Sequence, residues 1–322
     1  FGYREYLPSE INHLAKSARA WGRHLPAEWG LDLGQMLDAL TGMGYSAVVY
    51  ARQNIGDCSP HINSTFVVDE QASPDDKQRQ EFIQQTAKLA DITYRYIESG
   101  LPTILCTSNH ALVAIGHTYD PSVTARTAIE RIPEFIVNND AEGPYGRISI
   151  PLTDDAIKGL KEEVLSFYDI NEIIVVVPPE VTLRGEEAEL MASEQVADFL
   201  KTPYDSSINW QQALTQWRSE FGEWFKHLEY RTYLRPSVEW QADLRKCVEL
   251  DGKQANAAAS LLNIDYPKYV WITEISSSHL LNHVKKNERK CLGCVVVDST
   301  APTRTRGTIA MHVADVLAIH DR

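Results

Sequence analysis

The chain has 322 residues, of which 43% are apolar and 23% are charged, and its formal net charge at pH 7 is −13. A chain of this length is too long to fold around one small hydrophobic core, and its composition is that of an ordinary globular protein. The acidic balance without a basic stripe argues against a nucleic-acid partner. No apolar run approaches the roughly 20 residues that span a bilayer, so we expect no membrane partner either.

The five cysteines are few for this length, and the first residues do not resemble an export signal. Sparse cysteines without such a signal indicate a reducing compartment. We therefore expect a cytoplasmic protein with free thiols. The sequence begins with Phe1 rather than with an initiator Met, and its first residues resemble the interior of a domain. We therefore expect the natural chain to begin upstream of Phe1 or to be processed there.

The first half is predicted to begin with helices and to continue as an antiparallel sheet. Helices are indicated by apolar residues three and four apart, and strands by short β-branched or aromatic runs between turn residues. Asp32 is placed to cap the second helix. This order is typical of the α+β class. The predicted elements are helices at 7–25, 33–40 and 74–99 and strands at 46–50, 65–68, 103–106, 110–116, 135–138 and 147–150.

A change of character after Pro151 indicates a second domain. We place a first domain at 1–152 and a C-terminal α/β domain at 153–322. The second domain has no catalytic signature, and its expected role is to brace the first or to bind a partner protein. Its predicted elements are strands at 173–177, 266–275 and 292–298, helices at 186–200, 208–225 and 277–286, and an apolar tail at 309–319.

The candidate site consists of His110, which begins one predicted strand, and of Asn139 and Asp140, which end the next. Neighbouring strands lie roughly 4.8 Å apart, so side chains at their adjacent ends can touch. An imidazole oriented by an amide or a carboxylate can deprotonate a cysteine thiol. Strand alternation sends Asn139 and Asp140 to opposite faces, so we expect one of them to contact His110. We favour Asp140, which begins a turn where Asp is common; the alternative is a structural histidine beside ordinary turn residues.

Three segments carry a resemblance to a known family. HALVAIGHTYD resembles the His strand of papain-like cysteine peptidases, and FIVNNDAEGPYG resembles the strand that follows it. GLDLGQMLDALTGMGYSAVVYARQ resembles the stretch between their nucleophile helix and the His strand. The likeness is to the bacterial, bacteriocin-processing type and covers about residues 30–150.

The resemblance implies a papain-like fold and a protein or peptide substrate. It assigns His110 as the general base and Asn139 or Asp140 as the residue that orients it. It also implies a nucleophilic cysteine at a helix N-terminus before Leu31. Residues 1–30 contain no cysteine, so we expect the nucleophile upstream of Phe1.

Two cysteines of the first half are possible substitutes for that nucleophile. Cys58 precedes Pro60, which can open a helical turn, so Cys58 is the alternative nucleophile. Cys106 falls in a predicted strand, where we expect a buried thiol. His117 is expected to face away from His110 as a surface group at the end of its strand.

A CxxC pair, Cys291 and Cys294, raises the question of a metal. A structural zinc site needs four ligands, and only His279 and His283 are spaced to complete the set. Two thiols three residues apart on a regular strand face opposite ways. We expect no metal and no cofactor.

The sequence thus predicts a cysteine hydrolase, a peptidase, whose nucleophile precedes the chain. One alternative is a catalytically inactive papain-like interaction module of a bacterial defence or toxin system. Another is a transglutaminase or acyltransferase on the same scaffold, since the sequence does not distinguish water from an amine as acceptor.

Overall fold

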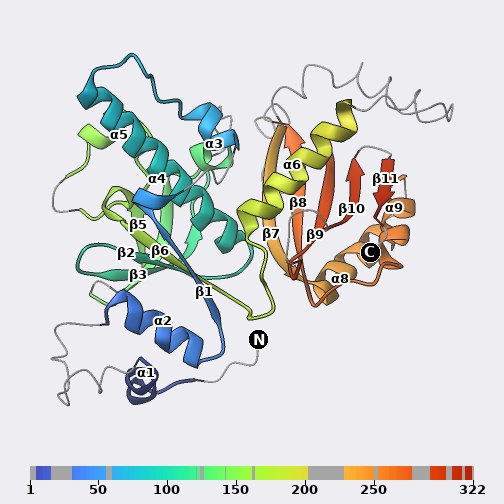
Figure 1. Ribbon diagram of the computed structural model, residues 1–322, viewed down its shortest axis with the longest axis horizontal. Coiled ribbons are helices and arrows are strands. Elements are labelled where there is room, and N and C mark those ends of the chain that lie inside the picture. The colour runs from blue at the N-terminus through green and yellow to red at the C-terminus, as the bar shows by residue number, and fades with distance from the viewer. Residues whose placement is uncertain are drawn as a thin grey trace.

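In the computed structural model, the described part of the chain has an α+β fold with two antiparallel sheets (Figure 1). No helix in this part combines the length and the apolar character that crossing a membrane requires. The structure describes residues 5–15, 31–55, 60–120, 122–123, 127–141, 143–161, 164–201, 228–249, 253–277, 291–301, 307–313 and 316–320.

The first sheet has six strands in the order β1-β6-β2-β3-β4-β5. Ile174 of β6 pairs with Val49 of β1 on one side and with Ile104 of β2 on the other. The first sheet therefore continues past residue 152, where we placed a domain boundary, because long-range pairing brings a later strand into it. The strands are β1 (Ser46–Ala51), β2 (Thr103–Cys106), β3 (Ala111–His117), β4 (Glu134–Asn139), β5 (Gly143–Ser149) and β6 (Glu172–Val177).

The helix α4 (Pro74–Glu98) covers one side of this sheet, and α1 (Pro8–Leu14) and α2 (Leu33–Gly42) lie on the other side (Figure 1). Asp32 caps α2 by accepting a hydrogen bond from the Gln35 N–H at 2.8 Å, as expected. Two short helices, α3 (Pro60–Thr65) and α5 (Asp154–Lys158), complete this part.

The second sheet is an antiparallel meander in the order β11-β10-β9-β8-β7. The helix α6 (Gly185–Lys201) lies between the two sheets (Figure 1), and α8 (Ser237–Glu249) and α9 (Lys253–Leu262) pack on the far face. The strands are β7 (Leu228–Pro236), β8 (Tyr269–Ser277), β9 (Gly293–Asp298), β10 (Thr308–Val313) and β11 (Val316–Ile319).

One apolar core crosses the boundary between the sheets. Leu112 and Phe135 of the first sheet belong to the same buried cluster as Trp271 and Val297 of the second. Alternate residues of the second sheet, such as Ile272, form a separate cluster under α8 and α9. Successive side chains on a strand point to opposite faces, so the second sheet is buried on both sides.

Several sequence predictions need correction. The strand expected at 65–68 is wrong, because Pro60 begins a helix that runs to Thr65. Ser277 ends β8 rather than beginning a helix. The rest of that helix, the helix expected at 208–225 and residues 16–25 of the first helix lie outside the described residues. The sequence reading did not predict β7, α8 or α9.

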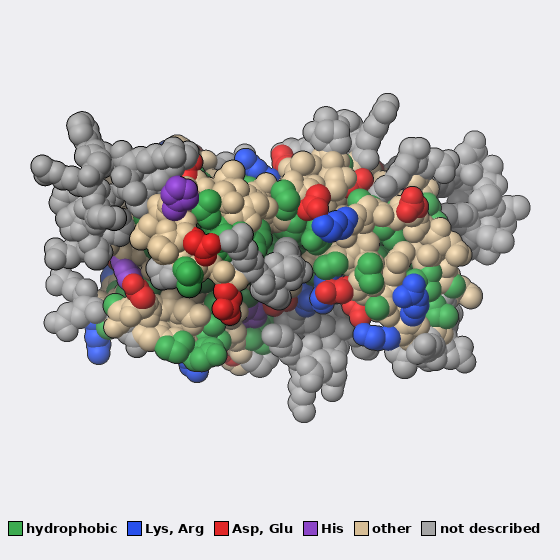
Figure 2. Space-filling view, turned by 90° about the horizontal axis from the view of Figure 1, so that it is seen from below, with side chains coloured by type: hydrophobic (Ala, Val, Ile, Leu, Met, Phe, Trp, Pro, Cys, Tyr) green, Lys and Arg blue, Asp and Glu red, His purple; other side chains and the backbone are tan. Residues whose placement is uncertain are grey.

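The described side chains on one face of the molecule carry charges of both signs. Figure 2 shows basic side chains scattered singly or in small groups, several of them beside acidic ones.

Candidate active site

His110 lies at the end of a tight turn between β2 and β3. The Thr107 N–H donates to the His110 carbonyl at 2.8 Å, and the Thr107 hydroxyl accepts from the His110 N–H at 3.0 Å. These two bonds fix the backbone of His110 one residue before β3 begins. The imidazole is therefore positioned by a strand end rather than by a free loop.

Asn139, the last residue of β4, meets this imidazole. Its Oδ1 atom lies 2.9 Å from His110 Nε2 and accepts a second hydrogen bond from the Ala141 N–H at 3.0 Å. Asn139 is buried, whereas the His110 side chain is one-third exposed. The amide is thus held from the protein side while the imidazole keeps contact with solvent.

The Ala141 contact determines which imidazole nitrogen carries the proton. A backbone N–H can only donate, so the side-chain atom that it reaches must be the amide oxygen of Asn139. That oxygen can only accept from His110, so Nε2 bears hydrogen in the neutral ring. Nδ1 is then the basic nitrogen, as a histidine general base requires.

Asp140 also approaches His110, with Oδ1 3.4 Å from Nε2. Strand alternation does not separate it from Asn139, because Asp140 lies beyond the end of β4, in the turn. Its side chain is 87% exposed, so water screens the contact. The shorter and better buried contact makes Asn139 the better orienting residue, in contrast to our preference for Asp140.

The β4–β5 hairpin holds Asn139 with an irregular backbone. The register shifts between Val137 and Asn139, which marks a bulge. Gly143 and Tyr145 have φ of 103° and 63°, in the left-handed region that disfavours a side chain such as that of Tyr145. Strain of this kind persists where the surrounding structure requires it, and Tyr145 lies four residues from Ala141 and five from Asp140.

The described cysteine next to this site, Cys106, does not supply a reactive thiol. Cys106 is buried in β2 opposite Ala111, and burial raises the pKa of its thiol to about 11, with a further contribution from Glu172. The thiolate is the nucleophile, so Cys106 is unreactive near neutral pH. Cys58 lies outside the described residues.

Of the CxxC pair, Cys294 lies in β9 of the second sheet and Cys291 lies two residues before that strand. Burial raises the pKa of Cys294 in β9. His279 and His283 lie outside the described residues, and the described residues contain no group of three or more metal-binding side chains.

His117 is not the surface group that we expected. Its side chain is 4% exposed, and Nε2 lies 2.8 Å from Glu98 Oε1 on α4. A register shift between Ala114 and Gly116 alters the alternation along β3 and explains the error. Glu98 also pairs with Arg231 of β7 at 3.3 Å, so this end of β3 is tied to the second sheet.

A cavity of about 600 Å³ lies beside the turn that carries His110. Thr107, Ser108 and Asn109 form one wall, and Phe82 of α4 contributes a ring. The segment 164–171 supplies the other lining residues, which are Val164, Leu165, Tyr168, Asp169 and Asn171. The candidate base therefore adjoins a space in the size range of ligand pockets, roughly 300–1,000 Å³.

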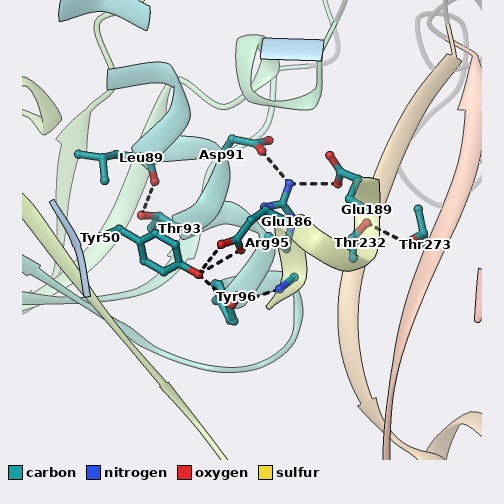
Figure 3. Close-up of polar contacts among 11 residues, drawn as sticks. Tyr50, Leu89, Asp91, Thr93, Arg95, Tyr96, Glu186, Glu189, Thr232 and Thr273 are labelled. Carbon is teal, nitrogen blue, oxygen red and sulfur yellow. Dashed lines mark hydrogen bonds and ion pairs between the residues drawn. The ribbon is translucent and has the colours of Figure 1, made fainter. Parts of the chain in front are cut away.

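A second group of ionisable residues is enclosed between α4 and α6 (Figure 3). Arg95 Nη2 bridges Asp91 at 2.8 Å and Glu189 at 3.0 Å, and the Tyr50 hydroxyl donates to Glu186 at 2.9 Å. Burial raises the pKa of Asp91 to about 6 and raises that of Glu186. The group joins two helices inside the protein, so we assign it to stability rather than to catalysis.

This buried group was not predicted from the sequence. Asp91 and Arg95 stand four residues apart on a helix, which is a common surface ion pair. Only the docking of α6 shows that they are buried and shared with Glu189.

Comparison of the chain with protein-family models, with curated proteins and with solved structures gives no match.

Proposed function

We propose that this chain carries the general base of a papain-like cysteine hydrolase, a peptidase that acts on a protein or peptide. The observation that supports this most strongly is the 2.9 Å contact between His110 Nε2 and the buried Asn139 Oδ1, which leaves Nδ1 basic. The Asn139 amide is itself held in place by the Ala141 N–H. A histidine with only a structural role at a strand end does not require a partner that is fixed in this way.

In the proposed reaction His110 Nδ1 takes the proton of a cysteine thiol, and the thiolate attacks the carbonyl carbon of the scissile amide. The imidazolium then gives its proton to the leaving amine as the C–N bond breaks, which leaves a thioester. Water attacks the thioester, His110 Nδ1 takes its proton, and the thiolate and the carboxylic acid are released. Asn139 Oδ1 accepts the Nε2–H throughout and so keeps Nδ1 aimed at the reacting atoms.

The nucleophile in this proposal is the expected cysteine upstream of Phe1, with Cys58 as the alternative. Cys106 is not a candidate because its thiol stays protonated. The same base could pass the acyl group to an amine, which would make the protein a transferase, and the product distinguishes the two reactions.

The experiment uses the protein together with the residues that naturally precede Phe1. A peptide library is incubated with the wild type and with His110→Ala, and products are identified by mass spectrometry with and without an added primary amine. We expect free carboxyl termini from the wild type and at least a 100-fold loss in the variant, within the range for a general base. A folded protein that forms a thiol-dependent product equally well without His110 would refute the proposal, and a folded wild type without any product would indicate the inactive interaction module.

A further inference from the structure

We propose that the cavity beside His110 binds a lysine or arginine side chain of the polypeptide substrate. This inference rests on the proposed function, because the bound side chain belongs to a substrate only if the protein is a hydrolase. The cavity itself is an open hollow of about 600 Å³, lined by the β2–β3 turn, by Phe82 and by five residues of the segment 164–171.

The first wall is continuous with the candidate base. Thr107, Ser108 and Asn109 line the cavity, and Thr107 makes both backbone bonds that fix His110. A residue bound in the cavity therefore lies next to the residue whose carbonyl would face the imidazole. This places the cavity where it can select the substrate.

The second wall is fixed from behind by Arg52, which is 4% exposed. Its Nη2 atom donates to the carbonyls of Phe167 at 3.1 Å and Tyr168 at 3.2 Å, and its Nε atom donates to that of Ile170 at 3.0 Å. A buried guanidinium with several acceptors is costly to displace, so the wall is formed before a ligand arrives. The Asn171 N–H joins it to β2 through the Cys106 carbonyl at 2.9 Å.

The floor combines aromatic rings with one carboxylate. The Phe82 and Tyr168 rings lie 4.3 Å apart between centroids. Asp169, which is exposed, is held by the Ser166 N–H at 2.9 Å and the Ser166 hydroxyl at 3.1 Å. The aliphatic stem of Lys or Arg packs on aromatic rings while its charged end seeks an acceptor.

The charges of the walls favour a cationic ligand over an anionic one. Asp169 is the only charged side chain among the described residues that line the cavity. The positive charge of Arg52 acts on Asp169, but Arg52 is 4% exposed, lies 4.1 Å from the Phe82 ring centroid and uses its donors on wall carbonyls. The carboxylate, rather than the guanidinium, therefore faces a bound side chain.

The test measures binding and does not need the nucleophile. The Nα-acetyl amides of lysine, arginine, norleucine and glutamate are titrated into the ¹⁵N-labelled protein, and the amide shifts of Ser108, Asn109 and Asp169 are followed. Asp169→Asn removes the charge, and Asp155→Asn, an exposed carboxylate on α5, is the matched control. His110→Ala shows whether binding is independent of the candidate base.

We expect the lysine and arginine amides to bind three- to fivefold more tightly than norleucine, the range for a solvent-accessible ion pair, and glutamate to bind most weakly. Asp169→Asn should abolish the preference, whereas Asp155→Asn and His110→Ala should keep it. Equal binding of lysine and norleucine, no shift at the cavity, or a preference that survives Asp169→Asn overturns the proposal. If the lysine and arginine amides bind as expected but the protein has no hydrolase activity, the binding site is supported and only the proposed reaction is refuted.

Discussion

Asn139 holds the His110 imidazole from the end of the neighbouring strand, with Oδ1 2.9 Å from Nε2. The same oxygen accepts the Ala141 N–H, so the amide cannot turn over without losing a second bond. This relationship gives His110 a defined tautomer and a defined direction. Both are needed before a histidine can act as a base toward a thiol.

The two candidate orienting residues should contribute very differently. For the cysteine that we propose as the nucleophile, we expect Asn139→Ala to slow iodoacetamide alkylation at pH 6 by about 10- to 100-fold, because the imidazole loses its orientation. Asp140→Asn removes only a screened, exposed contact, so we expect a change of less than about threefold. Alkylation rates measured by mass spectrometry decide this, and a larger effect of Asp140→Asn would make Asp140 the orienting residue.

Cys106 should be inert in the folded protein. Burial raises the pKa of its thiol to about 11, and the reactive species is the thiolate. At pH 7.5 we expect iodoacetamide to modify the exposed Cys247 at least ten times faster than Cys106, and both to react in urea. Rapid native labelling of Cys106 would return it to the list of candidate nucleophiles.

Local patterns in the sequence predicted the candidate site better than they predicted the sheet order. His110 and Asn139 lie 29 positions apart, at the adjoining ends of β3 and β4, which are consecutive along the chain, and such strands tend to pair. Strand β6 follows residue 152 in the sequence. Its place in the sheet between β1 and β2 depends on long-range contacts that no local pattern encodes. The same limit explains His117, whose direction is altered by a bulge in β3.

The buried ion pair between Arg131 and Glu229 should be important for attaching β7 to the short helical turn Ala128–Arg131 that precedes β4. Arg131 is 1% and Glu229 5% exposed, and two contacts of 3.1 and 3.3 Å join them. We expect Glu229→Gln to lower the free energy of unfolding by about 3 kcal/mol, because it removes the carboxylate charge that faces a buried guanidinium. Chemical denaturation measures this.

The exposed pair Arg235–Glu239 provides the control, since its side chains are 42% and 58% exposed. Glu239→Gln should cost less than about 1 kcal/mol. The double variant Arg131→Met, Glu229→Met should lose less stability than the two single changes added together. Strict additivity would show that the buried pair is not coupled.

The Asp91 carboxyl should make stability depend on pH. Burial raises its pKa from 3.8 to about 6 in the folded protein, against the opposing effect of Arg95. The native state therefore binds more protons than the unfolded state between those values, and the free energy of unfolding falls as pH rises from about 4 to 6. The contribution of Asp91 is at most about 3 kcal/mol.

Asp91→Asn should flatten this dependence, whereas Asp155→Asn, an exposed acid on α5, should leave it unchanged. Urea unfolding at pH 4.5, 5.5, 6.5 and 7.5 gives the slope for each protein. Burial also raises the pKa of Glu186, so some dependence of the unfolding free energy on pH should remain in the Asp91 variant. An unchanged slope would show that Asp91 ionises as it does in water.

The most direct test of the account is the protonation state of the His110 ring. A long-range ¹H–¹⁵N spectrum of the neutral imidazole distinguishes a protonated Nε2 from a protonated Nδ1. We predict the Nε2–H tautomer in the wild type and in Asp140→Asn, and a mixture of tautomers in Asn139→Ala. An Nδ1–H tautomer in the wild type, or a tautomer that does not depend on Asn139, would contradict the proposal that Asn139 prepares His110 to act as a base.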